Sequence, residues 1–427
     1  MGAKDIFNSE AGFITGPLYY IPNRRFIPPC VFQTSTTGKN LSLLGARTDE
    51  ITAGSMGLNE EESVKGTIGE FVERYAGAAI YRQKFVNADY HEMKAAGRNA
   101  LDPDEIRLFS ERQLADRSLG LDRPSRKHKI DWVEGQDALT GEKAWVPAFM
   151  VYLPYAHQHG EHHFYMPKST STGLAAGENF AHAFHGGFFE AAERHAFSRF
   201  WYKQHVENPP MYRKETLLKH FPEDKTLRQL YDNPFVEIAV FDLSEYVPVE
   251  CVAVFMFYEY KGKRMQTCGA SARFTKRDAL VKAAVEAYQG VEYGLSLQDK
   301  KLFGTQESEA NLADDFDKHF DFYNSFPNLR KEVPVLRRSI EEEGESGLFQ
   351  ATGSRLNALT SEQLKSCGLH GVFTVDITPE DIEELDLKVI RTVVPDFALL
   401  TGDHRYPFLG RLDEEDGFYT DWPHPFP

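Results

Sequence analysis

The sequence contains neither of the two common glycine-rich loops that bind nucleotide phosphates. Gly38-Lys39-Asn40 does not complete a Gly-x-x-x-x-Gly-Lys-Ser/Thr motif, and no Gly-x-Gly-x-x-Gly motif follows an expected strand. If the chain binds a nucleotide, other residues must hold its phosphates.

Cysteine is also scarce, and the four cysteines lie far apart at Cys30, Cys251, Cys268 and Cys367. None belongs to a Cys-x-x-Cys pair, which argues against a zinc site of that type and against a disulfide framework. Isolated cysteines are typical of a reducing cytoplasm, where we expect this protein.

Long apolar runs and an excess of basic charge are missing as well. No segment approaches the roughly 20 apolar residues of a membrane span, and the N-terminus lacks an apolar signal core. The chain has 48 Lys and Arg against 64 Asp and Glu, and the net charge of −16 argues against general nucleic-acid binding. Hydrophobic residues make up 41% of the 427 residues, enough for a substantial core.

Two expected helices carry the same acidic signature, Glu-x-x-Glu-Arg, one within residues 59–82 and one that follows the small-residue loop at 171–177. Residues three apart project from the same side of a helix. A single copy usually lies on a solvated face, but two copies behind polar or small-residue loops favour a site. Neighbouring carboxylates repel one another unless a cation lies between them, and oxygen ligands suit Mg²⁺. We therefore predict a Mg²⁺ site formed by Glu70, Glu73, Glu190 and Glu193.

A third long helix is expected over residues 276–297, with Lys282, Glu286 and Gln289 in a polar stripe along one side. A Lys/Glu pair at this spacing contributes only a few tenths of a kcal/mol on a surface helix. The stripe therefore matters only if this helix flanks the same cavity.

The chain ends in alternating prolines, from Asp421 to Pro427. Proline fixes φ and favours a stiff, extended conformation, while Trp422 and Phe426 are costly to leave in water. We predict a tail that docks on the protein rather than one that frays.

The remaining segments alternate between strand and helix patterns. Strands are expected at 18–21, twice within 132–146, and at 235–241, 251–260, 265–271, 372–377 and 388–394. Polar residues 34–40 predict a flexible connection. Thr378 and Pro379 predict a helix start, which makes residues 372–394 a strand–helix–strand unit with a right-handed crossover. The charge-rich residues 300–350 are interpreted as helix, loop and a solvated acidic segment.

Four histidines lie within seven residues, from His157 to His163. This density raises the alternative of a transition-metal site. The glycine and polar neighbours instead favour an exposed surface loop near the entrance of the main site.

Taken together, these motifs resemble the YcaO family, and within it the azoline-forming peptide cyclodehydratases of ribosomal peptide biosynthesis. The resemblance depends on the Gly-Glu-Phe-Val-Glu-Arg run at 69–74, the Ser-Thr-Gly-Leu-Ala-Ala-Gly loop at 171–177, the Glu-Ala-Ala-Glu-Arg run at 190–194, the third helix and the proline ending. It covers roughly residues 50–300 and 370–427.

The resemblance implies an α+β fold of mixed sheets flanked by long helices, with an ATP cavity that has no Walker loop. We expect an N-terminal segment over residues 1–50 and a YcaO domain over 51–427. That domain would carry an acidic insertion near 300–350 and the docked proline-rich tail.

The resemblance also implies roles for individual residues. The four glutamates would hold Mg²⁺ under the phosphates of ATP, and Arg194 would contact phosphate. The nucleotide would lie near Ser171, Glu178, His182, Lys282 and Glu286. The sequence departs from the usual family pattern at two of these positions, with His182 where glutamate is frequent and Lys282 where arginine is common.

The implied reaction is ATP-dependent cyclodehydration of Cys, Ser or Thr in a precursor peptide to a thiazoline or oxazoline. In the azoline-forming branch the Pro-x-Pro-x-Pro ending lies near the active site. This assigns Pro423, Pro425 and Pro427 to the catalytic centre, with the terminal carboxylate as a proton acceptor.

No segment resembles a leader-peptide recognition domain or the ubiquitin-activating-like partner, so we expect a separate partner protein that delivers the precursor peptide. A homodimer is the default expectation for a soluble enzyme. Two alternatives stay open: an enzyme of the same fold that forms thioamides or amidines, and a non-catalytic accessory protein that binds ATP. The proline ending argues against the first of these.

Overall fold

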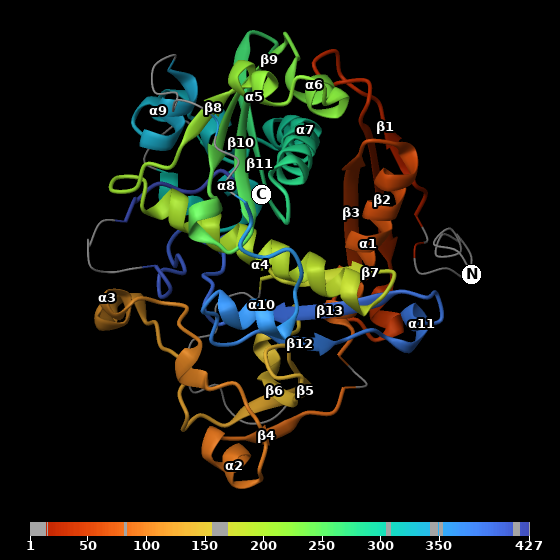
Figure 1. Ribbon diagram of the computed structural model, residues 1–427, viewed down its shortest axis with the longest axis vertical. Helices are drawn as coiled ribbons and strands as arrows, with labels where there is room; N and C mark the ends of the chain where they lie inside the picture. Colours follow the sequence, from red (N-terminus) through yellow and green to blue (C-terminus); the bar gives the residue numbers. More distant parts are fainter. Residues whose placement is uncertain are drawn as a thin grey trace.

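A long central helix, α4 (Phe180–Tyr202), crosses the middle of the molecule in this computed structural model (Figure 1). The structure describes residues 14, 16–80, 83–155, 170–304, 309–341, 349, 353–412 and 419–426. One side of α4 contacts strands β10 and β11, and another contacts β7 and β13. Because sheets cover it on two sides, the helix is apolar around much of its circumference.

The four-stranded sheet above α4 in Figure 1 is antiparallel and has the order β11-β10-β9-β8. Its strands are β8 (Met211–Arg213), β9 (Val236–Asp242), β10 (Glu250–Tyr260) and β11 (Lys263–Arg273). Helix α7 (Lys276–Lys300) covers one face and α4 the other. Alternate residues of β10 therefore enter two different cores, which explains why this strand is almost wholly apolar. The predicted strands at 235–241, 251–260 and 265–271 are confirmed.

The sheet below α4 has the order β4-β5-β12-β13-β7, with β6 paired to β5. Its strands are β4 (Val86–Ala88), β5 (Ile130–Asp137), β6 (Lys143–Pro147), β7 (Leu174–Gly177), β12 (Phe373–Asp376) and β13 (Lys388–Val393). The two strands predicted within 132–146 are confirmed as β5 and β6.

The predicted right-handed crossover over residues 372–394 is wrong, because β12 and β13 pair antiparallel. The intervening helix α11 (Glu380–Glu383) has only four residues, and a parallel return needs a much longer connection. Its cap is also different from the prediction: Pro379 occupies that position, while the Thr378 hydroxyl donates to Asp376.

A three-stranded antiparallel sheet lies beside α1 (Glu60–Ala78) and consists of β1 (Tyr19–Ile21), β2 (Phe32–Lys39) and β3 (Glu50–Gly57). The strand predicted at 18–21 is confirmed, but the prediction of a flexible connection at 34–40 is wrong because β2 occupies it. Its buried Thr34 hydroxyl lies 2.9 Å from the Ser63 hydroxyl and 2.8 Å from that of Thr67. The boundary expected near residue 50 falls between two strands, β2 and β3, that pair over eight residues.

The segment expected as an acidic insertion contributes to the core. Within it, α8 (Phe316–Ser325) packs on α7 and β11 and buries Phe320, Phe322 and Tyr323. Helix α9 (Pro334–Ile340) follows. The other helices are α2 (Tyr90–Ala95), α3 (Glu111–Ala115), α5 (Lys214–His220), α6 (Lys225–Tyr231) and α10 (Ser361–Ser366).

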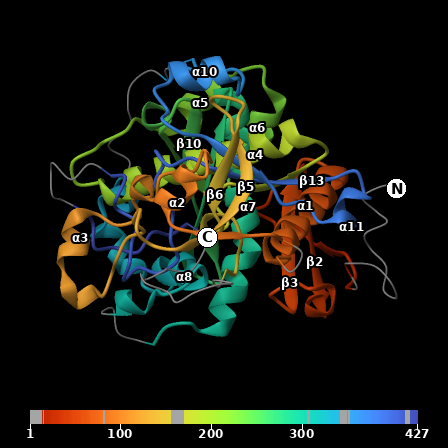
Figure 2. The same ribbon diagram turned by 90° about the horizontal axis from the view of Figure 1, so that it is seen from below.

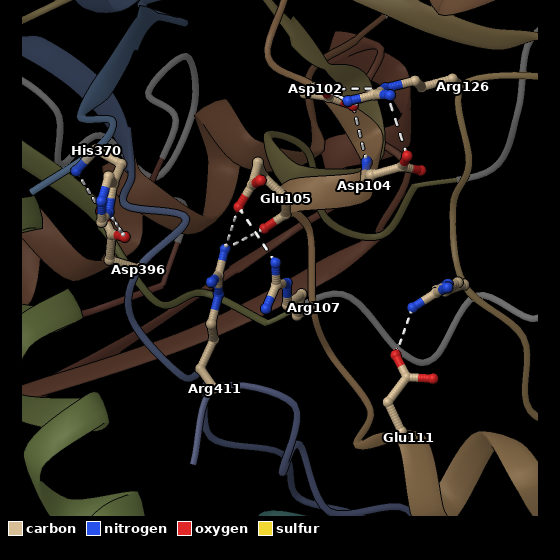
Figure 3. A network of polar contacts seen from close by, with 10 residues as sticks. Asp102, Asp104, Glu105, Arg107, Glu111, Arg126, His370, Asp396 and Arg411 are labelled. Atoms are coloured by element: carbon tan, nitrogen blue, oxygen red, sulfur yellow. Dashed lines mark hydrogen bonds and ion pairs between the residues drawn. The ribbon is translucent and has the colours of Figure 1, made fainter. Parts of the chain in front are cut away.

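The segment that leads into the tail is fastened to residues 105–113. The Arg411 guanidinium donates to the backbone carbonyl of Glu105 and pairs with its carboxylate, and Figure 3 shows Arg107 reaching that same carboxylate. The Gly410 N–H donates to the Leu108 carbonyl at 3.1 Å. Exposed ion pairs contribute little each, so this network mainly fixes the path of the chain.

The view from below places α1 and its sheet at one side of the molecule, with α7 between this sheet and the centre (Figure 2). In the described part of the chain, no helix combines the length and the apolar character that a membrane span requires.

Candidate active site

A cavity of about 320 Å³ lies between α1, β7 and α4. Both acidic helices line it, so Glu70 and Glu190 share one hollow although they come from distant parts of the sequence. Its size is in the range of small-molecule sites. The lining residues are Glu70, Glu73, Arg74, Leu153, Ser171, Leu174, Ala175, Ala176, His182, Gly186, Glu190 and Arg194.

The three long helices begin in the same way. Asn59, Asn179 and Thr275 each accept a hydrogen bond from the N–H three residues later and so fix the first turn. A glutamate follows 11 residues after each cap (70 − 59, 190 − 179 and 286 − 275). Each glutamate therefore lies about three turns after the start of its helix. The distance from cap to acid is a sequence signal that would have joined the third helix to the first two.

Backbone amides hold three of the carboxylates in place. Glu70 accepts from the Gly54 N–H at 2.8 Å, Glu73 from Ala176 at 2.8 Å and Glu190 from Gly173 at 2.9 Å. Each glutamate thus has one carboxylate oxygen fixed against a strand or loop. Such preorganisation is what a metal or phosphate site requires of its ligands.

Gly173 makes the small-residue loop possible. Its φ is +85°, in the left-handed region, and a Cβ there would lie 2.1 Å from the Thr392 carbonyl oxygen. The loop is further fixed by Arg391, which donates to the backbone carbonyls of Met150, Thr170 and Ser171. Burial lowers the pKa of Arg391 to about 10, and the nearby Glu190 opposes this effect.

The acidic side chains resist ionisation in this setting. Removal from water raises the pKa of Glu73 to about 8, with Glu190 and Glu70 adding repulsion against the Ala176 hydrogen bond. Burial likewise raises the pKa of Glu190, and it raises that of Glu193 well above its usual value with help from Glu286. A cation that neutralised these carboxylates would relieve the repulsion.

Two arginines supply part of the positive charge that these carboxylates require. Arg74 pairs with Glu70 at 2.7 Å, and the Arg194 guanidinium lies 3.8 Å from one oxygen of Glu190 and 3.8 Å from one oxygen of Glu193. Arg74 and Arg194 hold equivalent places in the two motif copies. The family resemblance assigns a role to Arg194 alone, although the parallel between the two motif copies is a sequence signal for Arg74 as well.

The donor set fits Mg²⁺. Carboxylate oxygens are the ligands this ion prefers, and Glu70, Glu73 and Glu190 line the cavity with two arginines. The fourth expected ligand, Glu193, is buried beside Arg194 and is not among the lining residues. Within the described ranges, no three acidic, histidine or cysteine side chains are already gathered around one point that could hold an ion. Three of the carboxylates instead each accept a hydrogen bond from a backbone N–H.

The remaining expected nucleotide-binding residues are divided between the cavity and the surface. Ser171 and His182 line the cavity. Glu286 lies close enough to Glu193 to raise its pKa, and pairs with Lys282 at 3.4 Å on α7. Glu178 is different: its side chain is 65% exposed and pairs with Lys65 outside the cavity.

Gln289 is a residue of this region whose role the sequence did not reveal. Its side chain accepts from the Met56 N–H at 3.2 Å and donates to the Gly54 carbonyl at 3.0 Å. It therefore ties α7 to the part of β3 whose Gly54 N–H holds Glu70. The polar stripe on the third helix flanks the same site as the two acidic helices.

The tail is buried next to the site. Pro423 and Pro425 are both buried, and the Phe426 ring lies 4.3 Å from the Arg194 guanidinium carbon. The prediction of a docked tail is confirmed for residues 422–426. Pro427 lies outside the described residues, as does the histidine cluster at 157–163.

A sequence model of the YcaO family, described as "YcaO cyclodehydratase", ATP- and Mg²⁺-binding, matches residues 54–398. This match confirms the expected family, and its description names the two cofactors that we expected. No curated protein matches the chain in sequence.

Solved structures share the fold. A heterocyclase in complex with substrate and cofactor is 17% identical with a TM-score of 0.70, over 99% of this chain and 56% of its own. The chain thus spans little more than half the length of that protein. YcaO from Methanopyrus kandleri, bound with AMPPCP and Mg²⁺, is 20% identical with a TM-score of 0.57 and coverage of 93% and 90%. A chain of the E. coli microcin synthetase McbBCD complex with pro-MccB17 bound is 16% identical, with a TM-score of 0.62 and coverage of 96% of each chain. These similarities confirm the expected fold class.

Proposed function

The chain belongs to the YcaO family, and we propose that it is an ATP-dependent peptide cyclodehydratase. One observation carries the proposal: the cavity lined by glutamates of two helices adjoins the buried proline tail through Arg194. An acidic, arginine-flanked cavity suits a metal-bound nucleotide, and the tail brings a second functional element beside it.

The substrate is proposed to be a ribosomal precursor peptide. A Cys, Ser or Thr side chain adds to the carbonyl carbon of the preceding amide, and the former carbonyl oxygen must then leave to give a thiazoline or oxazoline. Mg²⁺-bound ATP, when present, supplies the phosphoryl group that converts this oxygen into a leaving group. Positioning and charge neutralisation dominate such phosphoryl transfers.

The chain's own residues would carry the positioning. Four glutamates would hold Mg²⁺, and Arg194, on the same helix as Glu190, would orient a phosphate. Ser171, His182, Lys282 and Glu286 are the proposed nucleotide contacts. The apolar wall residues Leu153, Leu174 and Ala175 would limit the access of water to the reacting phosphate. For Glu178 we propose a role at the rim of the site, in keeping with its exposure.

The tail is proposed to serve the peptide half of the reaction. Pro423 and Pro425 would set its path, and the terminal carboxylate of Pro427 would accept the proton released when the side chain adds to the amide. The McbBCD complex contains several proteins and a bound substrate, which supports a separate partner protein that delivers the peptide. We further propose a homodimer and a cytoplasmic location.

The test is the mass of a product peptide. The purified chain, its partner and a precursor rich in Cys, Ser and Thr, encoded beside its gene, are incubated with ATP and Mg²⁺. A loss of one water for each ring supports cyclodehydration. Exchange of oxygen for sulfur would identify a thioamide-forming enzyme instead. An unchanged peptide, together with altered complex formation by Glu190→Gln, would identify an accessory protein.

A further inference from the structure

Four buried side chains bind the backbone of the tail, one carbonyl each. The Trp201 indole N–H donates to the Trp422 carbonyl at 2.9 Å, and the Tyr323 hydroxyl donates to that of Pro423 at 2.8 Å. The carbonyl of His424 lies 3.0 Å from His319 Nδ1, and that of Pro425 lies 3.1 Å from the Cys268 thiol. Every carbonyl from residue 422 to 425 thus has its own donor.

The chemistry of the groove matches that of the tail. Proline has no N–H, so alternating prolines leave the carbonyls as the main hydrogen-bonding groups of the segment. Buried carbonyls need partners, and α4, α8 and β11 supply only donors to them. The carbonyl of His424 can only accept, so His319 must carry its proton on Nδ1.

The two histidines also fix the register of the tail along the groove. The His319 and His424 rings stack with centroids 4.0 Å apart, and His424 Nε2 donates to the Thr401 carbonyl at 2.8 Å. A shift by one residue would bring a proline ring to the place of an imidazole that bonds on one side and stacks on the other. The contacts therefore select one register.

Phe426 connects the position of the tail to the cavity. Its ring packs between Phe197, at a centroid distance of 4.6 Å, and the Arg194 guanidinium, at 4.3 Å. Arg194 in turn lies 3.8 Å from Glu190 and from Glu193. One continuous set of contacts joins α8, through the tail, to the acidic wall of the cavity.

We propose that His319 and Tyr323 are positioning residues for the reaction. By holding the carbonyls of His424 and Pro423, they set the place of Phe426 and so the direction of Arg194. Neither residue lines the cavity, so they act through the tail. The inference rests on the proposed function for its effect on turnover, but the placement of the tail is measurable without it.

The first test compares two tyrosines. Tyr323→Phe removes only the hydroxyl that holds the tail. Tyr231→Phe is the matched control, because the Tyr231 hydroxyl is also buried and donates to a backbone carbonyl, that of Leu280, at 2.9 Å. We expect Tyr323→Phe to lower kcat for ring formation roughly tenfold, the scale of one lost hydrogen bond, at an unchanged KM for ATP. The control should stay within about twofold of wild type.

The second test exchanges the histidine. Asparagine can place an amide N–H near the position of Nδ1, whereas leucine cannot donate. His319→Asn should therefore recover most of the kcat that His319→Leu loses. Recovery by the donor alone separates positioning from a general loss of packing.

Hydrogen exchange of residues 419–427 gives a readout that does not depend on turnover. In the full chain without peptide, we expect Tyr323→Phe and His319→Leu to speed exchange at the Phe426 amide at least tenfold over Tyr231→Phe. Equal exchange in all three variants would overturn the inference, whether or not the wild type forms rings. If the wild type forms no rings while exchange responds as expected, the placement of the tail stands and the proposed function fails.

Discussion

Glu73 on α1 accepts a hydrogen bond from the backbone N–H of Ala176 on β7, at 2.8 Å. The bond joins the first acidic helix to the strand that leads directly into the second. A carboxyl group at this junction has two roles: it fastens the two halves of the cavity together, and, when ionised, it adds a negative charge to a cluster that resists ionisation. The predictions below separate such structural roles from functional ones.

Replacing Glu73 by glutamine should stabilise the metal-free protein at alkaline pH. The folded-state pKa of about 8 lies above the usual value of 4.5, so the folded state binds the proton more tightly. Stability from this group is present below pH 4.5 and is lost as the pH rises through 8. Glu73→Gln should remove that loss while its side-chain oxygen keeps the Ala176 bond. Denaturant unfolding of both proteins at pH 6 and pH 8.5 measures this difference in the free energy of unfolding.

The same variant should lose most of the stabilisation by Mg²⁺ and ATP. For wild type, ligand at 100 times its Kd stabilises by about 2.7 kcal/mol, or roughly 3 °C in Tm for a chain of this length. Glu61→Gln is the control, since that carboxylate lies on the same helix as Glu73 but is 77% exposed and does not line the cavity. A Glu73→Gln protein that keeps the full Tm shift would remove Glu73 from the metal site.

Gly173→Ala should destabilise the protein strongly and displace the amide that holds Glu190. The new Cβ would meet the Thr392 carbonyl oxygen at 2.1 Å, in addition to the cost of φ +85°. Gly141→Ala separates the two effects, because its φ is +75° but nothing lies within 4 Å of the added Cβ. By denaturant unfolding, we expect the free energy of unfolding to fall by about 1 kcal/mol in the control and by at least 3 kcal/mol in Gly173→Ala. Similar losses at both positions would contradict the close approach.

Deleting residues 425–427 should separate nucleotide binding from ring formation. The deletion removes Phe426 from Arg194 but leaves the glutamates and their amide partners in place. Calorimetry with Mg²⁺ and a non-hydrolysable ATP analogue should show affinity within about tenfold of wild type, while ring formation falls at least 100-fold, the scale of about 2.7 kcal/mol. Normal ring formation by the shortened chain would refute the role of the tail.

Acid should weaken the docking of the tail. Burial lowers the pKa of His424 to about 3 and that of His319 well below its usual value, so the unfolded chain binds these protons more tightly. Their contribution to stability is complete above pH 6.5 and decreases below it, by up to about 1.4 kcal/mol per pH unit for each histidine. The buried glutamates change the stability in the opposite direction as the pH falls. The test therefore compares a histidine variant with wild type. His424→Gln keeps a donor for Thr401, and between pH 6.5 and 5 its stability should fall less steeply than that of wild type. Identical pH slopes would exclude this contribution.

The helices of the site were predictable because each is specified by local signals. A side-chain cap, an uninterrupted helical pattern and Glu-x-x-Glu-Arg at a fixed distance identify α1 and α4 without reference to the rest of the chain. The hairpin of β10 and β11 was predictable for the same reason, because two apolar runs flank a tight turn. The proline tail also signalled its docking, since its aromatic residues needed a buried place.

Other features depended on partners that no local pattern reveals. Thr34 lies in a strand because Ser63 and Thr67 on α1 satisfy its hydroxyl, so a polar segment became part of a packed sheet. Glu178 follows β7 directly, yet its carboxylate points to Lys65 and away from the cavity.

The amino-acid sequence by itself determined which helices would form, how their acidic residues would be spaced and that the tail would seek burial, because caps, periodicity and proline act over a few residues. Only the tertiary structure decided that α8 would receive the tail and that Phe426 would meet Arg194. Those contacts join segments 100 or more residues apart, and they depend on the packing of whole helices and sheets.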